Sequence, residues 1–190
     1  MITGYDPDHP QNEWNQGAVM DFKEILALNY PHIGKYWHAG PELPLQKFTD
    51  AAIAVLNAIV KKALELEIRG IVPPMLVLWC NLLRWNESGR LGFEVLKACG
   101  VDRQLMEADI RQELSSRADS SDKAANWDKI CELARLAVKE TVHLKRNYVG
   151  SEHLVLALFK IEDPAIAQLF RKHGVTYENF QARLAELMGD

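Results

Sequence analysis

Three consecutive residues, Ser151, Glu152 and His153, carry the side chains of a hydrolytic triad. In such a triad a hydroxyl attacks the substrate, an imidazole takes the hydroxyl proton, and a carboxylate orients the imidazole. The segment that contains the three residues has a helical pattern, and neighbouring residues on a helix project about 100° apart. Three residues in a row therefore cannot converge on one substrate atom, and this run does not predict a hydrolase.

The three cysteines, Cys80, Cys99 and Cys131, each lie among apolar residues, and the chain contains no Cys-x-x-Cys pair. Isolated cysteines of this kind usually serve as small buried hydrophobic residues, and we expect them to be reduced. A remote alternative is a hydrolase or a metal protein that uses Cys131, His143 or His153. Apart from this alternative, the sequence predicts no catalytic residue, no metal and no cofactor.

Nucleotide hydrolysis and nucleic-acid binding are not predicted either. The Walker motif is absent, because the one Gly-Lys pair, Gly34–Lys35, is followed by Tyr36 and lacks the leading glycine. The formal net charge of −4 gives no electrostatic case for DNA or RNA, which bind basic surfaces. No apolar run approaches the roughly 20 residues that span a bilayer, so we expect a cytoplasmic protein without a membrane partner.

The elements that must position these residues begin after an N-terminal arm. Residues 1–47 contain five of the eight prolines and little periodicity, which is typical of loops. Within this arm one short helix is predicted from Ala18 to Leu28, where apolar residues share a face. We expect the rest of the arm to be irregular.

From Thr49 onward apolar residues recur at helical spacing, and no alternation typical of a strand is present. The pattern predicts a first set of four helices. Thr49 is expected to cap the first helix, and the second begins near Pro74. The third ends at Gly100, and Asp102 caps the fourth.

A second set of four helices follows in the same order. Ser151, Asp163 and Thr176 are expected to cap its last three helices, and Gly174 ends the third. His173 directly precedes that glycine, where a histidine interacts favourably with the last carbonyl groups of a helix.

Sequence similarity between the two sets predicts an internal duplication. Leu96–Asp102 (LKACGVD) matches Phe170–Thr176 (FRKHGVT) at a spacing of 74 residues, and Ile71–Leu76 (IVPPML) matches Val149–Leu154 (VGSEHL) at a spacing of 78. The difference of four residues fits an insertion within Leu78–Gly89 of the first copy. Such self-similarity is the signature of repeated structural units.

We therefore predict an all-α protein with two four-helix units related by a pseudo-two-fold axis. The first repeat covers residues 48–116 and the second covers residues 127–190. A serine-rich, charged linker at 117–126 joins them, and the two repeats together form one domain.

The second copy resembles the Clp-N repeat, which lies at the N-terminus of Clp-type AAA+ unfoldases and disaggregases. The likeness rests on SEHLVLALF (Ser151–Phe159), preceded by NYVG and followed by DPAIAQLFRKHGV. The first copy is similar through FTDAAIAVL, IVPPMLVL and VLKACGVD. The resemblance covers residues 48–188 and implies a bundle of eight helices that holds substrates or adaptor proteins near an ATP-driven ring.

The resemblance also implies roles for individual residues. In the disaggregase branch, a threonine that opens the first repeat and a glutamate in the second contribute to substrate handling, and these correspond to Thr49 and Glu152. Each has a structural alternative, as an N-cap and as an acid favoured by the helix dipole. The acidic residue that precedes this glutamate by six positions in that branch is Arg146 here, and Pro74 occupies the Glu152-equivalent position in the first repeat. His153 is expected to be a packing residue.

Trp79 and Trp85 lie on either side of the start of the inserted loop. Tryptophan is enriched at binding hot spots, so both are candidate partner-binding residues if they are exposed. The alternative is that Trp79 packs in the core and Trp85 covers a loop.

The function that we predict is a non-catalytic, monomeric module that binds unfolded or hydrophobic polypeptide segments, or a Clp adaptor, for a Clp-type chaperone-protease. The alternative is an accessory that docks on Clp peptidase or ATPase ring subunits and tunes their assembly. Some free-standing relatives accompany a Clp peptidase core, and the arm would suit such docking.

Overall fold

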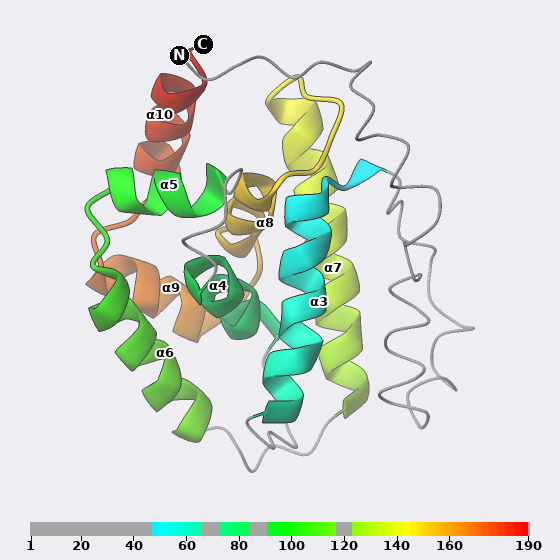
Figure 1. Cartoon of the computed structure of the whole chain (residues 1–190), viewed down its shortest axis with the longest axis vertical. Coiled ribbons are helices and arrows are strands. Elements are labelled where there is room, and N and C mark those ends of the chain that lie inside the picture. Colours follow the sequence, from blue (N-terminus) through cyan, green and yellow to red (C-terminus); the bar gives the residue numbers. More distant parts are fainter. Residues whose placement is uncertain (1–46, 66–72, 84–90, 117–122, 190) are drawn as a thin grey trace. The chain divides into compact units, whose positions relative to one another are not determined.

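The computed structural model describes residues 47–65, 73–83, 91–116 and 123–189. The first repeat contributes α3 (Asp50–Glu65), α4 (Pro73–Leu83), α5 (Leu91–Ala98) and α6 (Arg103–Ser116). The second contributes α7 (Lys123–His143), α8 (Ser151–Leu158), α9 (Pro164–Lys172) and α10 (Tyr177–Met188), as Figure 1 shows. The all-α prediction is confirmed for these residues. The predicted arm lies outside the described residues, except for Lys47.

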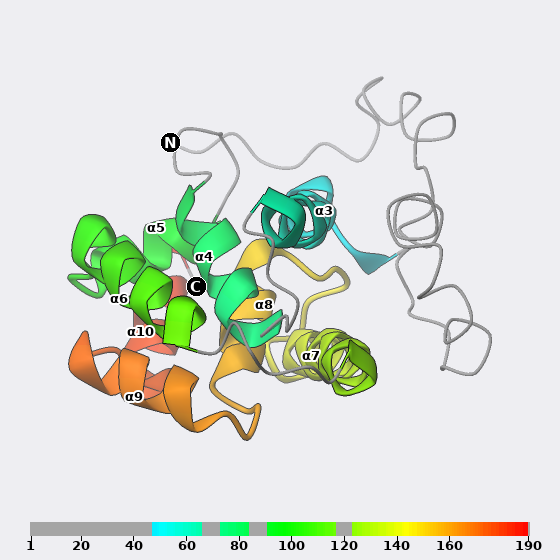
Figure 2. The same ribbon diagram turned by 90° about the horizontal axis from the view of Figure 1, so that it is seen from below.

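The two sets of four helices pack in corresponding ways, as expected for a duplication. α3 packs against α4 as α7 packs against α8, and α4 contacts α7 as α8 contacts α3. In the same way α6 contacts α9 and α10 contacts α5. Figures 1 and 2 show α4 and α8 at the centre, with α3 and α7 on one side and the other four helices on the opposite side. The predicted pseudo-two-fold arrangement is thus confirmed.

The helix ends repeat the sequence spacing of 74 residues. Gly100 and Gly174 follow α5 and α9 with left-handed φ angles of 86° and 67°. Asp102 and Thr176 then cap α6 and α10, each accepting a hydrogen bond from the amide three residues later, at 3.0 and 3.1 Å. Glycine is favoured in the left-handed conformation because it has no Cβ.

Two predicted boundaries differ from the structure. α7 begins at Lys123, so the last four residues of the segment predicted as a linker, 117–126, are helical. Ser151 is the first residue of α8 rather than its cap, and Gly150 occupies the N-cap position with an extended backbone. The Ser151 hydroxyl does not cap its own helix because it is engaged by α5.

The contact between α5 and α8 sets a very close approach between the two repeats. The Gly92 amide donates a hydrogen bond to the Ser151 hydroxyl oxygen at 3.1 Å. A Cβ atom at Gly92 would lie only 2.8 Å from the Ser151 carbonyl oxygen. Every residue of α8 is buried, so the helix has no free side toward which it could move. Only glycine fits at this position without a shift of backbone.

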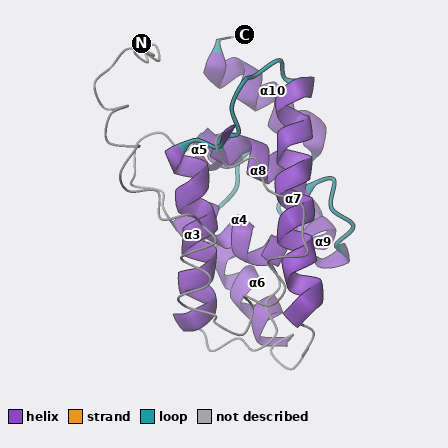
Figure 3. Ribbon diagram, turned by 90° about the vertical axis from the view of Figure 1, so that its right-hand side faces the viewer, coloured by secondary structure: helices purple, strands orange, loops and turns teal. Residues whose placement is uncertain are grey.

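Figure 3 shows the helical character of the described residues, with α7 as the longest element. Among the described helices, none combines the length and the apolar character that a membrane span requires.

The substitution Gly92→Ala tests the close approach. In an ordinary helix this change stabilises by roughly 1 kcal/mol, because alanine loses less backbone entropy than glycine. Here we expect a loss of about 1–3 kcal/mol in the free energy of unfolding, because the added methyl group separates two backbones. Urea unfolding of the full chain measures this.

The matched control is Glu94→Ala, on the exposed face of the same helix, which should change stability by about 0.5 kcal/mol or less. A gain in stability for Gly92→Ala would show that α5 and α8 are not held in backbone contact.

Candidate partner-binding site

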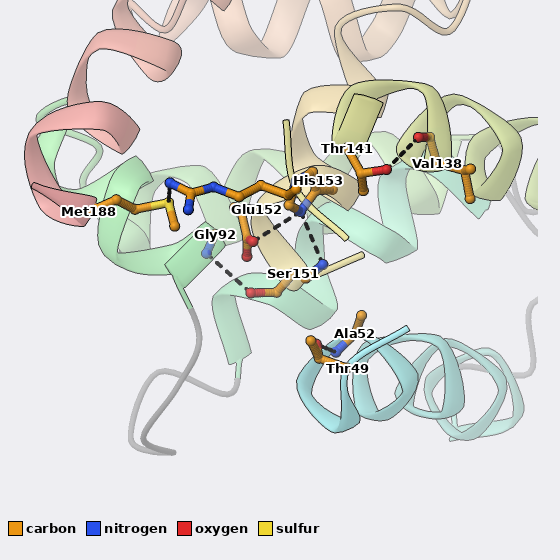
Figure 4. Close-up of polar contacts among 11 residues, drawn as sticks. Thr49, Ala52, Gly92, Val138, Thr141, Ser151, Glu152, His153 and Met188 are labelled. Atoms are coloured by element: carbon orange, nitrogen blue, oxygen red, sulfur yellow. Dashed lines mark hydrogen bonds and ion pairs between the residues drawn. The ribbon is translucent and has the colours of Figure 1, made fainter. Parts of the chain in front are cut away.

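Thr49 occupies the N-terminus of α3, as Figure 4 shows. Its hydroxyl oxygen accepts a hydrogen bond from the Ala52 amide at 3.3 Å, which confirms the capping role. The Thr49 amide donates to the Val149 carbonyl at 2.9 Å, and the Val149 amide donates to the Lys47 carbonyl at 2.7 Å. These bonds tie the start of the first repeat to the chain just before α8. A contact between Thr49 and a bound partner stays a prediction.

Glu152 and His153 form a buried polar pair at the N-terminus of α8 (Figure 4). Their exposed fractions are 3% and 1%, which confirms the packing role of His153. The Glu152 Oε1 atom lies 2.9 Å from His153 Nδ1, and the same Nδ1 accepts a hydrogen bond from the Gly150 amide at 3.0 Å. The Glu152 carboxylate also lies against Gly150, where a Cβ would collide with it. Contact between Glu152 and a bound chain stays a prediction, and it requires α8 to move.

Ser151 does not complete a triad with this pair. Its hydroxyl lies against the Gly92 amide of α5, so it is bonded across the repeats rather than to the imidazole. The side chains of Glu152 and His153 do contact each other although they are consecutive in the helix, but among the described residues no nucleophilic side chain contacts the pair.

The remote metal or hydrolase alternative also lacks a suitable geometry. Cys131 is buried, whereas His143 is exposed twelve residues later on the same helix, α7. At 1.5 Å per residue this separates them by about 18 Å along the helix axis. In the part of the chain that the structure describes, no group of three or more potential ligands could hold a metal ion.

The side chain of Arg146 reaches from the loop after α7 to Met188, the last residue of α10. Its Nη2 atom lies 3.6 Å from the Met188 sulfur. The side chain is half-buried. This places a cation at the junction of two elements of the second repeat, and its role toward a partner stays a prediction.

Trp79 is a core residue, as the alternative interpretation of the sequence expected, so the condition of exposure for a partner-binding role is not met. Its exposed fraction is 1%, because it belongs to the central helix α4. The Arg111 guanidinium lies 5.2 Å from the centre of its ring. Burial acts to raise the pKa of Glu107, but hydrogen bonds from Arg111 and Trp79 outweigh it and lower that pKa. Two neighbours of the Trp79 ring, Glu107 and Arg111, belong to the first repeat, as Trp79 itself does. Trp85 lies outside the described residues.

A cleft with a volume of about 280 Å³ lies between α6 and α9, where the two repeats meet. We refer to it as the α6–α9 cleft. Its apolar residues are Met75, Ala165 and Leu169. Polar and charged residues supply the rest of its lining: Asp109, Gln112, Glu113, Ser116, Gln168 and Lys172. Most of the residues around the cleft are therefore polar or charged.

The cleft accompanies a difference between the repeats. Gly92 allows α5 to touch α8, whereas the residue 74 positions later is Ile166, whose side chain is buried in α9. An isoleucine side chain occupies space that Gly92 leaves free. α9 accordingly contacts α6 but makes few close contacts with α4. The cleft lies on the side where α9 and α4 are not in close contact.

Asp109 of α6 joins the two repeats beside the cleft. Its carboxylate accepts a hydrogen bond from Lys172 Nζ at 2.8 Å and lies 2.9 Å from His173 Nε2. The hydrogen bond from Lys172 is the largest influence on the pKa of Asp109 and lowers it. Burial acts in the opposite direction, and the hydrogen bond from His173 lowers the pKa further. The sequence predicted that His173 acts on its own helix end, and it missed this bond because Asp109 lies 64 residues away.

Asp109→Asn tests this link through its pH dependence. A pKa that is lower in the folded state adds stability above the unfolded value of about 3.9, and this stability is lost as the pH falls through the folded pKa. We expect the variant to be less stable at neutral pH by about 1 kcal/mol, and the difference to shrink as the pH falls from about 5 to about 2. Urea unfolding over this pH range measures both. Lys172→Met should reduce the same pH dependence, and a difference that is constant with pH would contradict the link.

Comparison with known proteins agrees with the fold. Residues 47–173 match the family model described as "Clp repeat (R) N-terminal domain". The chain is also similar to the crystal structure of the Hsp104 N-terminal domain from Candida albicans, with a TM-score of 0.54 and 21% sequence identity. That match covers 75% of this chain and 92% of the other.

The likeness to the solved structure shows the fold, and the family match covers the helices from α3 through α9. Domains of this family are non-catalytic modules that bind substrates or adaptors for Clp AAA+ chaperones. The chain therefore belongs to the Clp repeat N-terminal domain family.

Proposed function

We propose that this chain recruits a protein partner, either a substrate polypeptide or an adaptor, to a Clp-type chaperone-protease, and that the partner docks in the α6–α9 cleft. Family membership supports the recruiting role. The observation that carries the choice of site is the cleft itself, which lies between the two repeats and combines an apolar part with a polar one.

The size and lining of the cleft suit a peptide segment. A volume of about 280 Å³ is at the lower end of the range for small-molecule sites, and it accommodates one or two side chains. Met75 at the base of the cleft is fully buried and Leu169 is 6% exposed, so the apolar contact on offer is small, while the exposed amide groups of Gln112 and Gln168 can bond to a peptide backbone. Asp109 is already paired with Lys172, so the cleft presents less negative charge than its residues suggest.

Gln168→Trp tests the site by filling the cleft from its edge. Gln168 is exposed, so the substitution should leave the fold intact. We expect the affinity of the full chain for a labelled, chemically unfolded polypeptide or a labelled Clp adaptor to fall about tenfold, because the indole occupies space that the partner needs. Fluorescence anisotropy gives the dissociation constants, and circular dichroism checks the fold.

The matched control is Ala167→Trp, at the exposed neighbouring position on α9, which does not line the cleft. It should bind as the unmodified chain does. Equal binding by both variants and the unmodified chain would place the partner elsewhere. Failure of the unmodified, folded chain to bind either probe would reject the recruiting role.

The polar edge of the cleft also supports a second candidate function, docking on a Clp peptidase or ATPase ring. A folded ring subunit presents fixed hydrogen-bonding groups, which a polar site recognises better than it recognises varied unfolded chains. Sedimentation of the chain with assembled ring subunits distinguishes the two functions. Co-sedimentation without any affinity for unfolded polypeptide or adaptor would favour docking on the ring.

A further inference from the structure

Four of the described helices are followed by a residue in the left-handed conformation, and α7 is the one at which this residue is not glycine. Gly100, Gly174 and Gly189 occupy this position after α5, α9 and α10, with φ between 67° and 86°. After α7 the residue is Lys145, with φ 54°. The conformation is fixed by backbone bonds from the Arg146 amide to the Thr141 carbonyl at 2.7 Å and from the Lys145 amide to the Val142 carbonyl at 3.2 Å.

A lysine at this position is less favourable for folding than a glycine, because its Cβ is strained when φ is positive. A cation near the C-terminus of a helix is favoured by the helix dipole. Lys139 and His143, however, already place cationic or basic groups in the last two turns of α7 without that strain. An unfavourable backbone conformation that persists is an indication of a functional demand on the side chain.

Lys145 belongs to an exposed basic and apolar surface at the end of α7. Val142 is 75% exposed and Tyr148 is 39% exposed. We refer to this area as the α7-end surface, and its exposed residues are Arg135, Lys139, Val142, His143, Lys145 and Tyr148. On a helix, residues three and four positions apart are neighbours, so Arg135, Lys139 and Val142 follow one side of α7.

The nearest acidic groups do not neutralise this surface. Glu140 is buried, and its carboxylate accepts a hydrogen bond from the Tyr177 hydroxyl at 2.7 Å. Glu132 is exposed and, three positions before Arg135, neighbours that arginine, but it lies about two helical turns before Lys139. The C-terminal half of α7 therefore presents basic side chains around an exposed valine.

We propose that the α7-end surface binds an acidic polypeptide segment that carries an apolar side chain. The lysines attract carboxylates, and charge complementarity of this kind steers association and fixes the orientation of a partner. Val142 and Tyr148 favour a partner with an apolar side chain, and duplex DNA offers apolar contact only through the methyl groups of thymine. The surface is separate from the α6–α9 cleft, and the inference does not depend on what binds there.

The charge of the surface is tested with Lys139→Glu in the full chain. The probe is a fluorescein-labelled peptide of glutamate and leucine, measured by fluorescence anisotropy at several salt concentrations. We expect binding that weakens as salt rises and that falls roughly tenfold in Lys139→Glu. The matched control Arg171→Glu changes an exposed cation on α9 and should bind as the unmodified chain does.

The same probe with glutamine in place of glutamate should not bind. Equal binding of both peptides, or equal loss in both charge-reversal variants, would overturn the proposal. Tighter binding to duplex DNA or to vesicles that contain phosphatidylserine would also overturn it, because the partner would then belong to another class. The Gln168→Trp variant should bind the acidic peptide normally, so failure of the cleft proposal leaves this test intact.

Lys145→Gly separates the proposed role from a structural one. Glycine relieves the strain at the end of α7, so the midpoint of thermal unfolding should rise by about 2–4 °C. Affinity for the acidic peptide should fall by roughly threefold, because one cation is lost. A variant that is more stable and binds equally well would show that Lys145 is not part of a binding surface. A variant that is less stable would show that the lysine serves the fold.

Discussion

The backbone contact between Gly92 and Ser151 constrains the arrangement of both repeats. It brings the second residue of α5 against the first residue of α8, and the missing side chain at Gly92 is what allows the Ser151 hydroxyl to accept the Gly92 amide. α8 is buried along its whole length, so α5 cannot be accommodated by moving α8. The orientation of Glu152 and His153, which continue α8 from this contact, is fixed with it.

The same contact explains why the duplication does not give two equal sites. On the side of α5 and α8, the repeats meet backbone to backbone, and the polar groups at the N-terminus of α8 are buried. On the side of α9 and α4, the position equivalent to Gly92 is Ile166, and the α6–α9 cleft lies where the helices are less close. The difference in side-chain volume between Gly92 and Ile166 thus accompanies a closed junction at α5 and α8 and a more open one at α9 and α4.

The sequence was sufficient to predict the fold because the relevant signals are local. Helical periodicity, the caps Asp163 and Thr176, and the glycines Gly100 and Gly174 each act within a few residues of where they stand in the chain. The match between the two copies then added the long-range information that the four-helix unit occurs twice. Together they predict the order of the described helices and most of their ends, although the start of α7 and the cap of α8 differ.

The candidate site was predicted less well, because it depends on pairs of residues that are distant in sequence. Asp109 bonds to His173 across 64 positions, and no local pattern announces such a pair. Trp79 was ambiguous, since an apolar helix containing a tryptophan can be central or peripheral, and α4 proved to be central. Glu152 was recognised by its resemblance to a family position. Its burial, however, depends on how closely α5 approaches α8, and that distance is set by Gly92.

Lys145 is a position where the residue that local helix-end rules favour, glycine, is not used, and such a departure can indicate function. Glycine is the residue that a left-handed helix end favours, and it occupies three such ends in the part of the chain that the structure describes. At the fourth, the lysine accepts backbone strain next to an exposed valine and other exposed basic residues. A structural explanation would need a folding benefit that lysine gives and glycine does not. The helix dipole provides no such benefit, because Lys139 and His143 already place basic groups near the end of α7. The deviation is more simply explained by a partner that binds the lysine. On this account the property of Lys145 that matters is its charge and not its contribution to stability.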